Sequence, residues 1–118
     1  MNKTLGLEES VMDSNCLFCK IIDKQIPAKI EYEDDQVMVF HDINPKAPVH
    51  LLIIPKKHIP TMMDVEPSDL SLMSNIHEVA QKMYHKHELQ GMRLINNCGK
   101  KGGQEVFHLH YHLWGWME

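Results

Sequence analysis

The sequence predicts an α+β fold, because segments with the periodicity of strands surround one long segment with the periodicity of a helix. Short apolar or alternating runs indicate five strands, and apolar residues at three- and four-residue steps indicate the long helix. A shorter helix precedes the strands. In chain order the predicted elements are residues 16–22, 30–33, 37–40, 51–54, 67–87, 92–97 and 106–113.

Length and composition fit a single small domain. A chain of 118 residues buries about 65% of its unfolded surface, which is enough for one core. The formal net charge of −4 argues against binding of nucleic acid through a broad basic surface. No run has the apolar length of a membrane span or a signal peptide, so we expect no membrane partner and a cytoplasmic location. We expect a flexible leader over residues 1–15 and a folded domain over residues 16–118.

The short helix over residues 16–22 has a start signal and a stop signal. Asn15 can accept a hydrogen bond from the first turn, so it is the expected N-cap. Pro27 lacks a backbone N–H and prevents the helix from running further. This helix should therefore be a separate element ahead of the sheet.

Three strands are predicted after the short helix. We expect residues 30–33 and 37–40 to form alternating strands, and the Asp34-Asp35 pair between them favours a hairpin turn. Residues 51–54 are continuously apolar, as expected of a strand buried in the middle of a sheet.

The long helix begins at residues 67–69, where proline suits the first turn. Its apolar residues recur at helical steps, so one face is expected to cover the sheet. That predicted face consists of Leu70, Met73, Ile76, Ala80, Met83, Tyr84 and His87. The last two strands, 92–97 and 106–113, are separated by a loop that contains three glycines.

The most informative motif is a row of histidines at alternate positions: His108, His110 and His112. In a strand the three imidazoles share one face, while the residues between them enter the core. Rings two residues apart then stand roughly 6.6–6.8 Å from one another, a row that spans a phosphate group and its neighbours. This spacing favours an anion site over a mononuclear metal site.

His110, at the centre of the row, is the expected nucleophile. An imidazole with an ordinary pKa of about 6.5 is in good part unprotonated at cytoplasmic pH, so it can attack phosphorus. Nε2 attacks only if Nδ1 holds the proton, and a backbone carbonyl commonly fixes that tautomer. Attack at the α-phosphorus of a nucleotide would give a nucleotidyl-histidine, which water then hydrolyses. No cofactor is required if nearby donors neutralise the phosphoryl charge.

With residues elsewhere in the chain, the row resembles the histidine triad (HIT) superfamily and, within it, the bacterial type of Hint protein. The matching segments keep the family's order and approximate spacing from about Cys16 to Trp114. They are Phe18, Ile26-Pro27-Ala28, Glu33-Asp34-Asp35, Phe40-His41-Asp42-Ile43, Ala47-Pro48, His50, Ile54-Pro55-Lys56-Lys57-His58, Asn97, Gly102-Gly103-Gln104 and the triad. The resemblance implies a HIT-like fold: a five-stranded antiparallel sheet with one long and one short helix, paired as a homodimer with a continuous ten-stranded sheet.

The resemblance also assigns the phosphate end of a nucleotide site. The residues that match the family's catalytic row and its donors are His50, Asn97, His108, His110 and His112. Gly103, followed by Gln104 and Glu105, matches the loop that approaches phosphate, because glycine leaves room for the backbone to contact an anion. Glu105 stands where eukaryotic Hint proteins carry a serine that assists the leaving group, so the proton donor for that step stays open.

At the nucleoside end, Asp42 matches the carboxylate that accepts both ribose hydroxyls, although a carboxylate here can also be a simple turn residue. An apolar slot matches the family's purine site, which holds the base by stacking and burial with little discrimination. The residues of this slot are Phe18, Ile21, Phe40, Ile43 and Leu52. The expected partners are AMP, GMP and their phosphoramidates.

Cys16 and Cys19 form a Cys-x-x-Cys pair, which by itself supplies half of a tetrahedral zinc site. Some similar bacterial HIT proteins complete the site with two histidines, which match His58 and His108 here. Such a zinc has four protein ligands and no place for substrate, so it would be structural. Free buried thiols and redox chemistry are the alternatives.

Together these features predict a purine-nucleotide hydrolase that cleaves the P–N bond of nucleoside 5′-phosphoramidates such as adenylyl-amines. Two alternatives stay open. Hydrolysis of dinucleoside polyphosphates would use the same nucleophile with a different leaving group. A non-catalytic nucleotide-sensing module would bind without turnover, although binding alone needs donors rather than a nucleophile.

Overall fold

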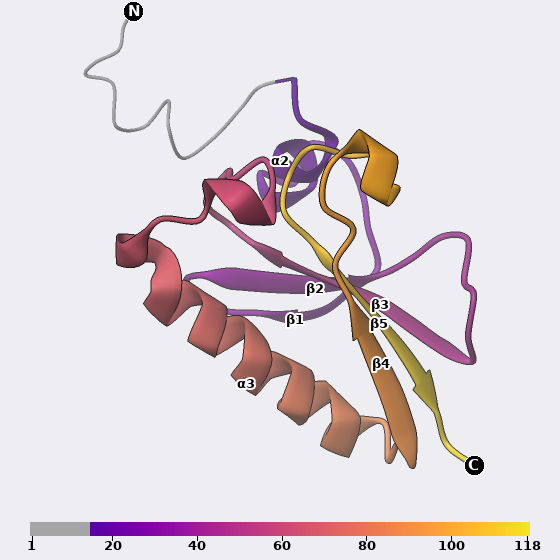
Figure 1. Cartoon of the computed structure of the whole chain (residues 1–118). Coiled ribbons are helices and arrows are strands. Elements are labelled where there is room, and N and C mark those ends of the chain that lie inside the picture. Colours follow the sequence, from indigo (N-terminus) through magenta and orange to yellow (C-terminus); the bar gives the residue numbers. More distant parts are fainter. Residues whose placement is uncertain (1–14) are drawn as a thin grey trace, which may run out of the picture.

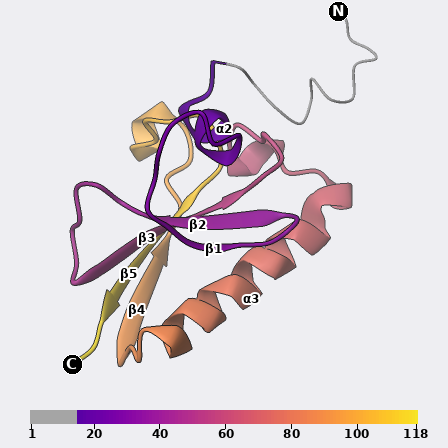
Figure 2. The ribbon, with the colours of Figure 1, turned by 180° about the vertical axis from the view of Figure 1, so that it is seen from behind.

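A computed structural model describes residues 15–118, so residues 1–14 of the expected leader lie outside the described part. The described chain forms one sheet with the long helix α3 across one face and the short helix α2 near one end (Figure 1). The view from behind shows the same arrangement (Figure 2). The α+β prediction is confirmed.

The sheet has five strands, and every neighbouring pair is antiparallel. The strands are β1 (Ile30–Glu33), β2 (Val37–His41), β3 (Val49–Pro55), β4 (Gly91–Ile95) and β5 (Tyr111–Trp116). Their order is β1-β2-β3-β5-β4, so β3 lies in the centre and β1 and β4 form the two edges. The central position explains why all seven residues of β3 are buried.

Two apolar cores lie on opposite faces of this sheet. Alternate residues of β2 belong to different cores, with Val37 and Val39 on the α3 side and Met38 and Phe40 on the α2 side. Because both faces are covered, β2 and β3 read as continuous apolar runs rather than as alternating strands. The second core brings α2 against the sheet beside the histidine row.

Helix α2 (Leu17–Ile22) begins one residue later than its predicted cap requires. The N-cap is Cys16 rather than Asn15, and its Sγ accepts a hydrogen bond from the backbone N–H of Cys19 at 3.4 Å. The helix already ends at Ile22, and Lys24 follows with a positive φ of 63°. Pro27 is therefore not the residue that stops it.

Helix α3 (Leu70–Lys86) follows a separate 3₁₀ turn, η2 (Pro67–Asp69). Its predicted face is partly wrong, because Leu70 is 59% exposed while Leu72 and Val79 are buried. Leu70 belongs to α3 itself, and residues two positions apart in an α-helix are rotated by about 200°, so Leu70 faces away from the stripe that contains Leu72. The buried residues of α3 are Leu72, Ile76, Val79, Ala80 and Met83.

The two last strands also differ from the prediction. Strand β4 stops at Ile95 instead of Asn97, and β5 runs over residues 111–116 instead of 106–113. Backbone pairing between them ends at Ile95 and His112, so His110 lies just before the strand. Leu109 and Leu113 are nevertheless fully buried, as the alternating pattern predicts.

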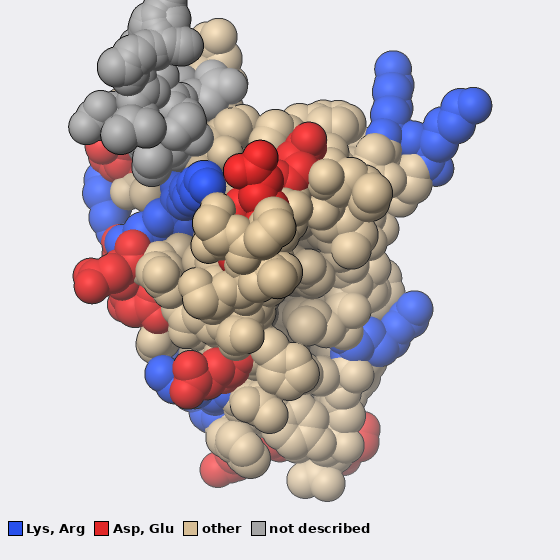
Figure 3. All heavy atoms as spheres, turned by 60° about the vertical axis from the view of Figure 1, so that its left-hand side comes forward, with Lys and Arg blue, Asp and Glu red and all other residues tan. Residues whose placement is uncertain are grey.

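Acidic and basic side chains are interspersed around the rim of the face seen in Figure 3, and uncharged side chains fill its middle. Within residues 15–118, no helix combines the length and apolarity needed to cross a membrane.

Candidate active site and metal cluster

The imidazole of His110 is held in one tautomer by the backbone. Its Nδ1–H donates to the carbonyl oxygen of His108 at 2.7 Å, which leaves Nε2 with a free lone pair. Burial lowers the pKa of His110, against smaller upward effects of that carbonyl and of Asp42. His110 thus has the tautomer and the neutral ring that the sequence analysis required of a nucleophile.

The histidine row is more compact than an extended strand would make it. The ring centroids of His110 and His112 are 5.2 Å apart, because His110 precedes β5 and does not have strand spacing. The ring of Phe18 meets His110 edge-on at 5.1 Å and His108 at 5.9 Å. Helix α2 thereby packs directly against two of the three histidines.

His112 belongs to a polar network with His50 and Asp42. The Nε2 of His50 lies 2.9 Å from Nδ1 of His112 and 3.4 Å from Oδ2 of Asp42. The backbone N–H of Lys46 donates to His50 Nδ1 at 3.0 Å, which favours a proton on His50 Nε2. His50 then donates to His112 Nδ1, and the proton of a neutral His112 lies on Nε2. Burial is the main factor that lowers the pKa of both rings.

Trp114 joins this network, although the sequence analysis did not select it. Its indole Nε1 lies 3.1 Å from His50 Nε2 and can donate there only while that nitrogen carries no proton. Trp114 and Lys46 therefore favour opposite tautomers of His50. The only signal in the sequence is its position two residues after the triad.

Four of the five residues of the predicted purine slot lie together in the structure. Phe18, Ile21, Phe40 and Leu52 belong to one buried cluster on the α2 face, and the rings of Phe18 and Phe40 meet edge-on at 5.5 Å. Ile43 is 92% exposed and is not part of this cluster. Asp42 directly follows β2, the strand that carries Phe40, and its carboxylate belongs to the polar network of His50.

The glycine-rich loop contains a 3₁₀ turn, η3 (Lys100–Gly102), between two residues with positive φ. Gly99 has φ of 79° and Gly103 of 95°, values that few other residues adopt without strain. A Cβ at Gly103 would lie 3.7 Å from Cγ of Asn97, so this loop passes the side chain of the predicted donor. Gly103 itself is exposed.

Gln104 points inward. It is 4% exposed, its Oε1 accepts from the N–H of Gly99 at 2.9 Å, and its Nε2 donates to the carbonyls of Pro60 and Val106 at 2.7 and 3.0 Å. Its side chain anchors the loop rather than facing a nucleotide. Glu105 is exposed and lines a hollow of about 330 Å³, which also reaches Cys16 and His58.

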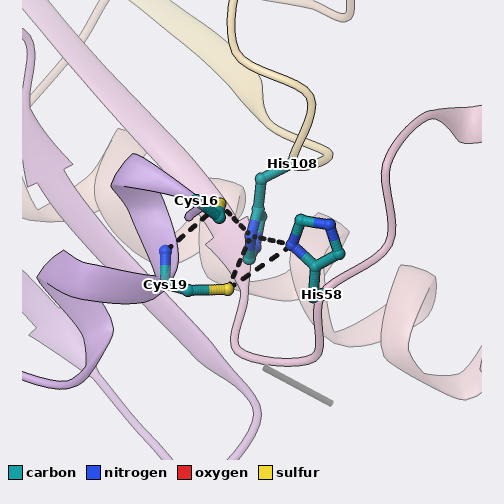
Figure 4. A group of neighbouring side chains, drawn as sticks. All are labelled: Cys16, Cys19, His58 and His108. Atoms are coloured by element: carbon teal, nitrogen blue, oxygen red, sulfur yellow. Dashed lines mark hydrogen bonds between the residues drawn. The ribbon is translucent and has the colours of Figure 1, made fainter. Parts of the chain in front are cut away.

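Cys16, Cys19, His58 and His108 converge at the start of α2 (Figure 4). Their ligand atoms lie within 4.8 Å of one another. The Nε2–H of His108 donates to the carbonyl of Pro55 at 2.7 Å, so its Nδ1 lone pair faces the cluster. Burial lowers the pKa of His108 to about 4, which keeps the ring neutral.

The spacing of these atoms fits tetrahedral zinc. Zinc bonds of about 2.3 Å to sulfur and about 2.05 Å to nitrogen give ligand separations of about 3.3 Å for N–N and about 3.6 Å for N–S. The two Nδ1 atoms of His58 and His108 are 3.2 Å apart. Three of the four S–N distances are 3.4 Å for Cys16–His108, 3.4 Å for Cys19–His58 and 3.6 Å for Cys19–His108. The set that the resemblance implies is therefore brought together at separations that suit this metal.

Asn96 is another residue that the sequence analysis did not select. Its Nδ2 donates to the carbonyl of His110 at 2.9 Å, and its Oδ1 is buried without a hydrogen-bond partner among the described residues. Nothing in the sequence indicated Asn96 as a site residue, since only its neighbour Asn97 matches the family pattern.

Comparisons with known proteins agree with this architecture. A family model described as scavenger mRNA decapping enzyme C-term binding matches residues 15–118. Protein HitA of Neisseria gonorrhoeae is 44% identical over 102 residues, which are 86% of this chain and 95% of HitA.

Solved structures give the same result. The chain is similar to a HIT family hydrolase of Legionella pneumophila, with 50% identity, a TM-score of 0.84 and coverage of 86% of this chain and 92% of that one. It is also similar to a histidine triad protein of Clostridium difficile, with 44% identity, a TM-score of 0.85 and coverage of 90% and 94%. The resemblance drawn from the sequence is confirmed, and the chain belongs to the histidine triad superfamily.

Proposed function

We propose that this protein is a Hint-type hydrolase that cleaves the P–N bond of purine nucleoside 5′-phosphoramidates through a nucleotidyl intermediate on His110. The observation that most directly supports this proposal is the 2.7 Å hydrogen bond from His110 Nδ1–H to the carbonyl of His108, because it leaves Nε2 free to attack. The hydrolase names of the Legionella relative and of a Clostridium thermocellum relative support a hydrolytic reaction.

In the first step the lone pair of His110 Nε2 forms a bond to the α-phosphorus, and the P–N bond breaks. The departing amine takes its electron pair and needs a proton. His112 Nε2–H is the expected source, since His50 occupies its Nδ1. In the second step water attacks the phosphorus and gives a proton to His112 Nε2, which lost one in the first step. The bond to His110 breaks with its electron pair returning to Nε2, and the nucleoside monophosphate leaves.

Binding would use the remaining predicted residues. The cluster around Phe18 and Phe40 would hold AMP or GMP by apolar contact, Asp42 the ribose hydroxyls, and the backbone at Gly103 with Asn97 the phosphate. We expect a homodimer with a continuous sheet, which requires an edge strand, and β1 and β4 are the two edges.

Zinc would be held by Cys16, Cys19, His58 and His108. A four-ligand site supplies structural stabilisation rather than Lewis-acid chemistry at the substrate, since no ligand position is left for it. The protein's own part is to fix His108, whose carbonyl accepts the hydrogen bond from His110 Nδ1–H.

The decisive test is mass spectrometry of enzyme quenched during turnover of an adenylyl-amine. We expect an adenylyl adduct on the peptide that carries His110 and none in His110→Ala, which should still bind AMP. His77→Ala, which changes an exposed histidine of α3, is the matched control and should form the adduct normally. A wild-type enzyme that turns over without any adduct, or an adduct on another residue, would refute the mechanism.

The second candidate reaction is hydrolysis of dinucleoside polyphosphates, which would use the same nucleophile. The ratio of kcat/KM for an adenylyl-amine to that for a diadenosine polyphosphate separates the two, and a clear preference for the polyphosphate would replace our choice. Absence of turnover on both, with nucleotide binding intact, would favour the sensing module.

A further inference from the structure

The backbone at His110 lies just beyond the last paired residues of β4 and β5. Pairing between β4 and β5 ends at Ile95 and His112, and extension of that register would place residue 97 opposite His110. The side chain of Asn96 makes a bond there instead, from Nδ2 to the carbonyl oxygen of His110 at 2.9 Å. The Asn96 side chain thus takes the place that a backbone hydrogen bond between β4 and β5 would have if the pairing continued.

Both hydrogen bonds that involve His110 depend on backbone orientation. The carbonyl of His110 accepts from Asn96, and its ring donates to the carbonyl of His108. The His110–Tyr111 peptide and the χ angles of His110 together decide where Nε2 lies. Loss of the Asn96 contact would release that peptide, while the contact of Phe18 with the His110 ring and the burial of Leu109 in the core would remain.

The contact is kept at a cost in stability. Oδ1 of Asn96 is buried and has no partner among the described residues, and an unpaired buried polar atom costs roughly 1–3 kcal/mol. An apolar residue of similar size would avoid this cost. An asparagine in this place therefore suggests that its Nδ2–H is needed for something other than stability.

We propose that Asn96 is a positioning residue that fixes the peptide of His110, and thereby aims Nε2 at the phosphorus. This inference rests on the proposed function, and it assigns to the site a residue outside the family's triad and donor set. The hydrogen bond of Asn96 is to the backbone carbonyl of His110 and not to the ring that would react. It should affect formation of the adduct and leave ground-state nucleotide binding almost unchanged.

The test measures two quantities on Asn96→Ala: the single-turnover rate of adduct formation and the Kd for AMP. Misplacement of a reacting group by about 1 Å can cost on the order of 100-fold, so we expect the rate to fall about 10- to 100-fold. The Kd should change less than about threefold. Asn75→Ala is the matched control, because its side-chain amide also donates to neighbours, Asp34 and Gln36, but far along the chain from the triad.

An unchanged rate in Asn96→Ala would overturn the proposal, and so would an equal loss of AMP affinity, which would indicate general collapse of the site. Asn96→Ser supplies the same readouts if the alanine variant does not fold.

A measurement without turnover separates this proposal from the proposed function. Nitrogen-15 NMR of the His110 ring should show a single Nδ1–H tautomer in the wild type and a mixture in Asn96→Ala. If the wild type forms no adduct but the tautomer still depends on Asn96, the mechanism fails and the positioning role stands. A tautomer that does not respond to the substitution overturns the positioning role.

Discussion

A carboxylate that joins β1 to both β2 and α3 gives a pH-dependent prediction. Glu31 forms ion pairs with Lys86 and, at 2.7 Å, with His41, and its side chain is 11% exposed. Burial alone would raise the pKa of Glu31, but hydrogen bonds from Lys86 and His41 outweigh it and lower the pKa from 4.5 to about 2. The ionised carboxylate therefore stabilises the folded state.

The size of this contribution follows from the two pKa values. A fall from 4.5 to about 2 corresponds to at most about 3.4 kcal/mol at neutral pH. The Lys86 side chain is 53% exposed and water screens its charge, so we expect about 1–2 kcal/mol. Because the folded-state pKa is the lower one, the stabilisation is complete above pH 4.5. It falls below half by about pH 3 and vanishes below pH 2.

The assay is urea unfolding of the wild type and Glu31→Gln between pH 7 and pH 2.5. The gap in unfolding free energy should close between about pH 5 and pH 2.5, as the Glu31 carboxylate is protonated. Glu78→Gln, which changes an exposed carboxylate on α3, should follow the wild type throughout. A gap that stays constant from pH 5 to pH 2.5, or widens over that range, would refute the reasoning.

Two further predictions concern the loop and the cluster. Gln104→Ala removes the three hydrogen bonds of a buried side-chain amide, whose backbone partners are half-buried or exposed. The unfolding free energy should therefore fall by roughly 1–3 kcal/mol and the KM for nucleotide should rise, whereas an unchanged stability would mean that the amide bonds are dispensable. Incubation with a chelator should lower the melting temperature before it lowers activity, and Cys19→Ser should abolish that chelator response. Loss of turnover at an unchanged melting temperature would contradict a structural metal.

The parts of the fold that follow from periodicity were predictable from the sequence. Alternation around the triad correctly placed Leu109 and Leu113 in the core, and the apolar run of β3 correctly indicated a central strand. Both results depend only on which side of a strand a residue faces. The helix face was less certain, because Leu70 and Leu72 are both apolar but lie on opposite sides of α3, so apolar character alone does not decide which one is buried.

The metal set and the neutral His110 followed from the resemblance and from imidazole chemistry, respectively. The contacts of Asn96 and Trp114 could not be predicted in this way, since they depend on where β4 stops and on how an indole is oriented across the sheet. Gln104 shows the converse case. Its place in the family pattern pointed to ligand binding, whereas its amide is used by the protein's own loop.

His108 serves two neighbours at once, through its ring on the cysteine side and through its carbonyl on the His110 side. A protein engineer who grafts the three histidines onto another scaffold would therefore transfer an incomplete unit. The cysteine pair and the Pro55 carbonyl would have to move with them, because without these anchors the carbonyl that selects the reactive tautomer loses its fixed direction.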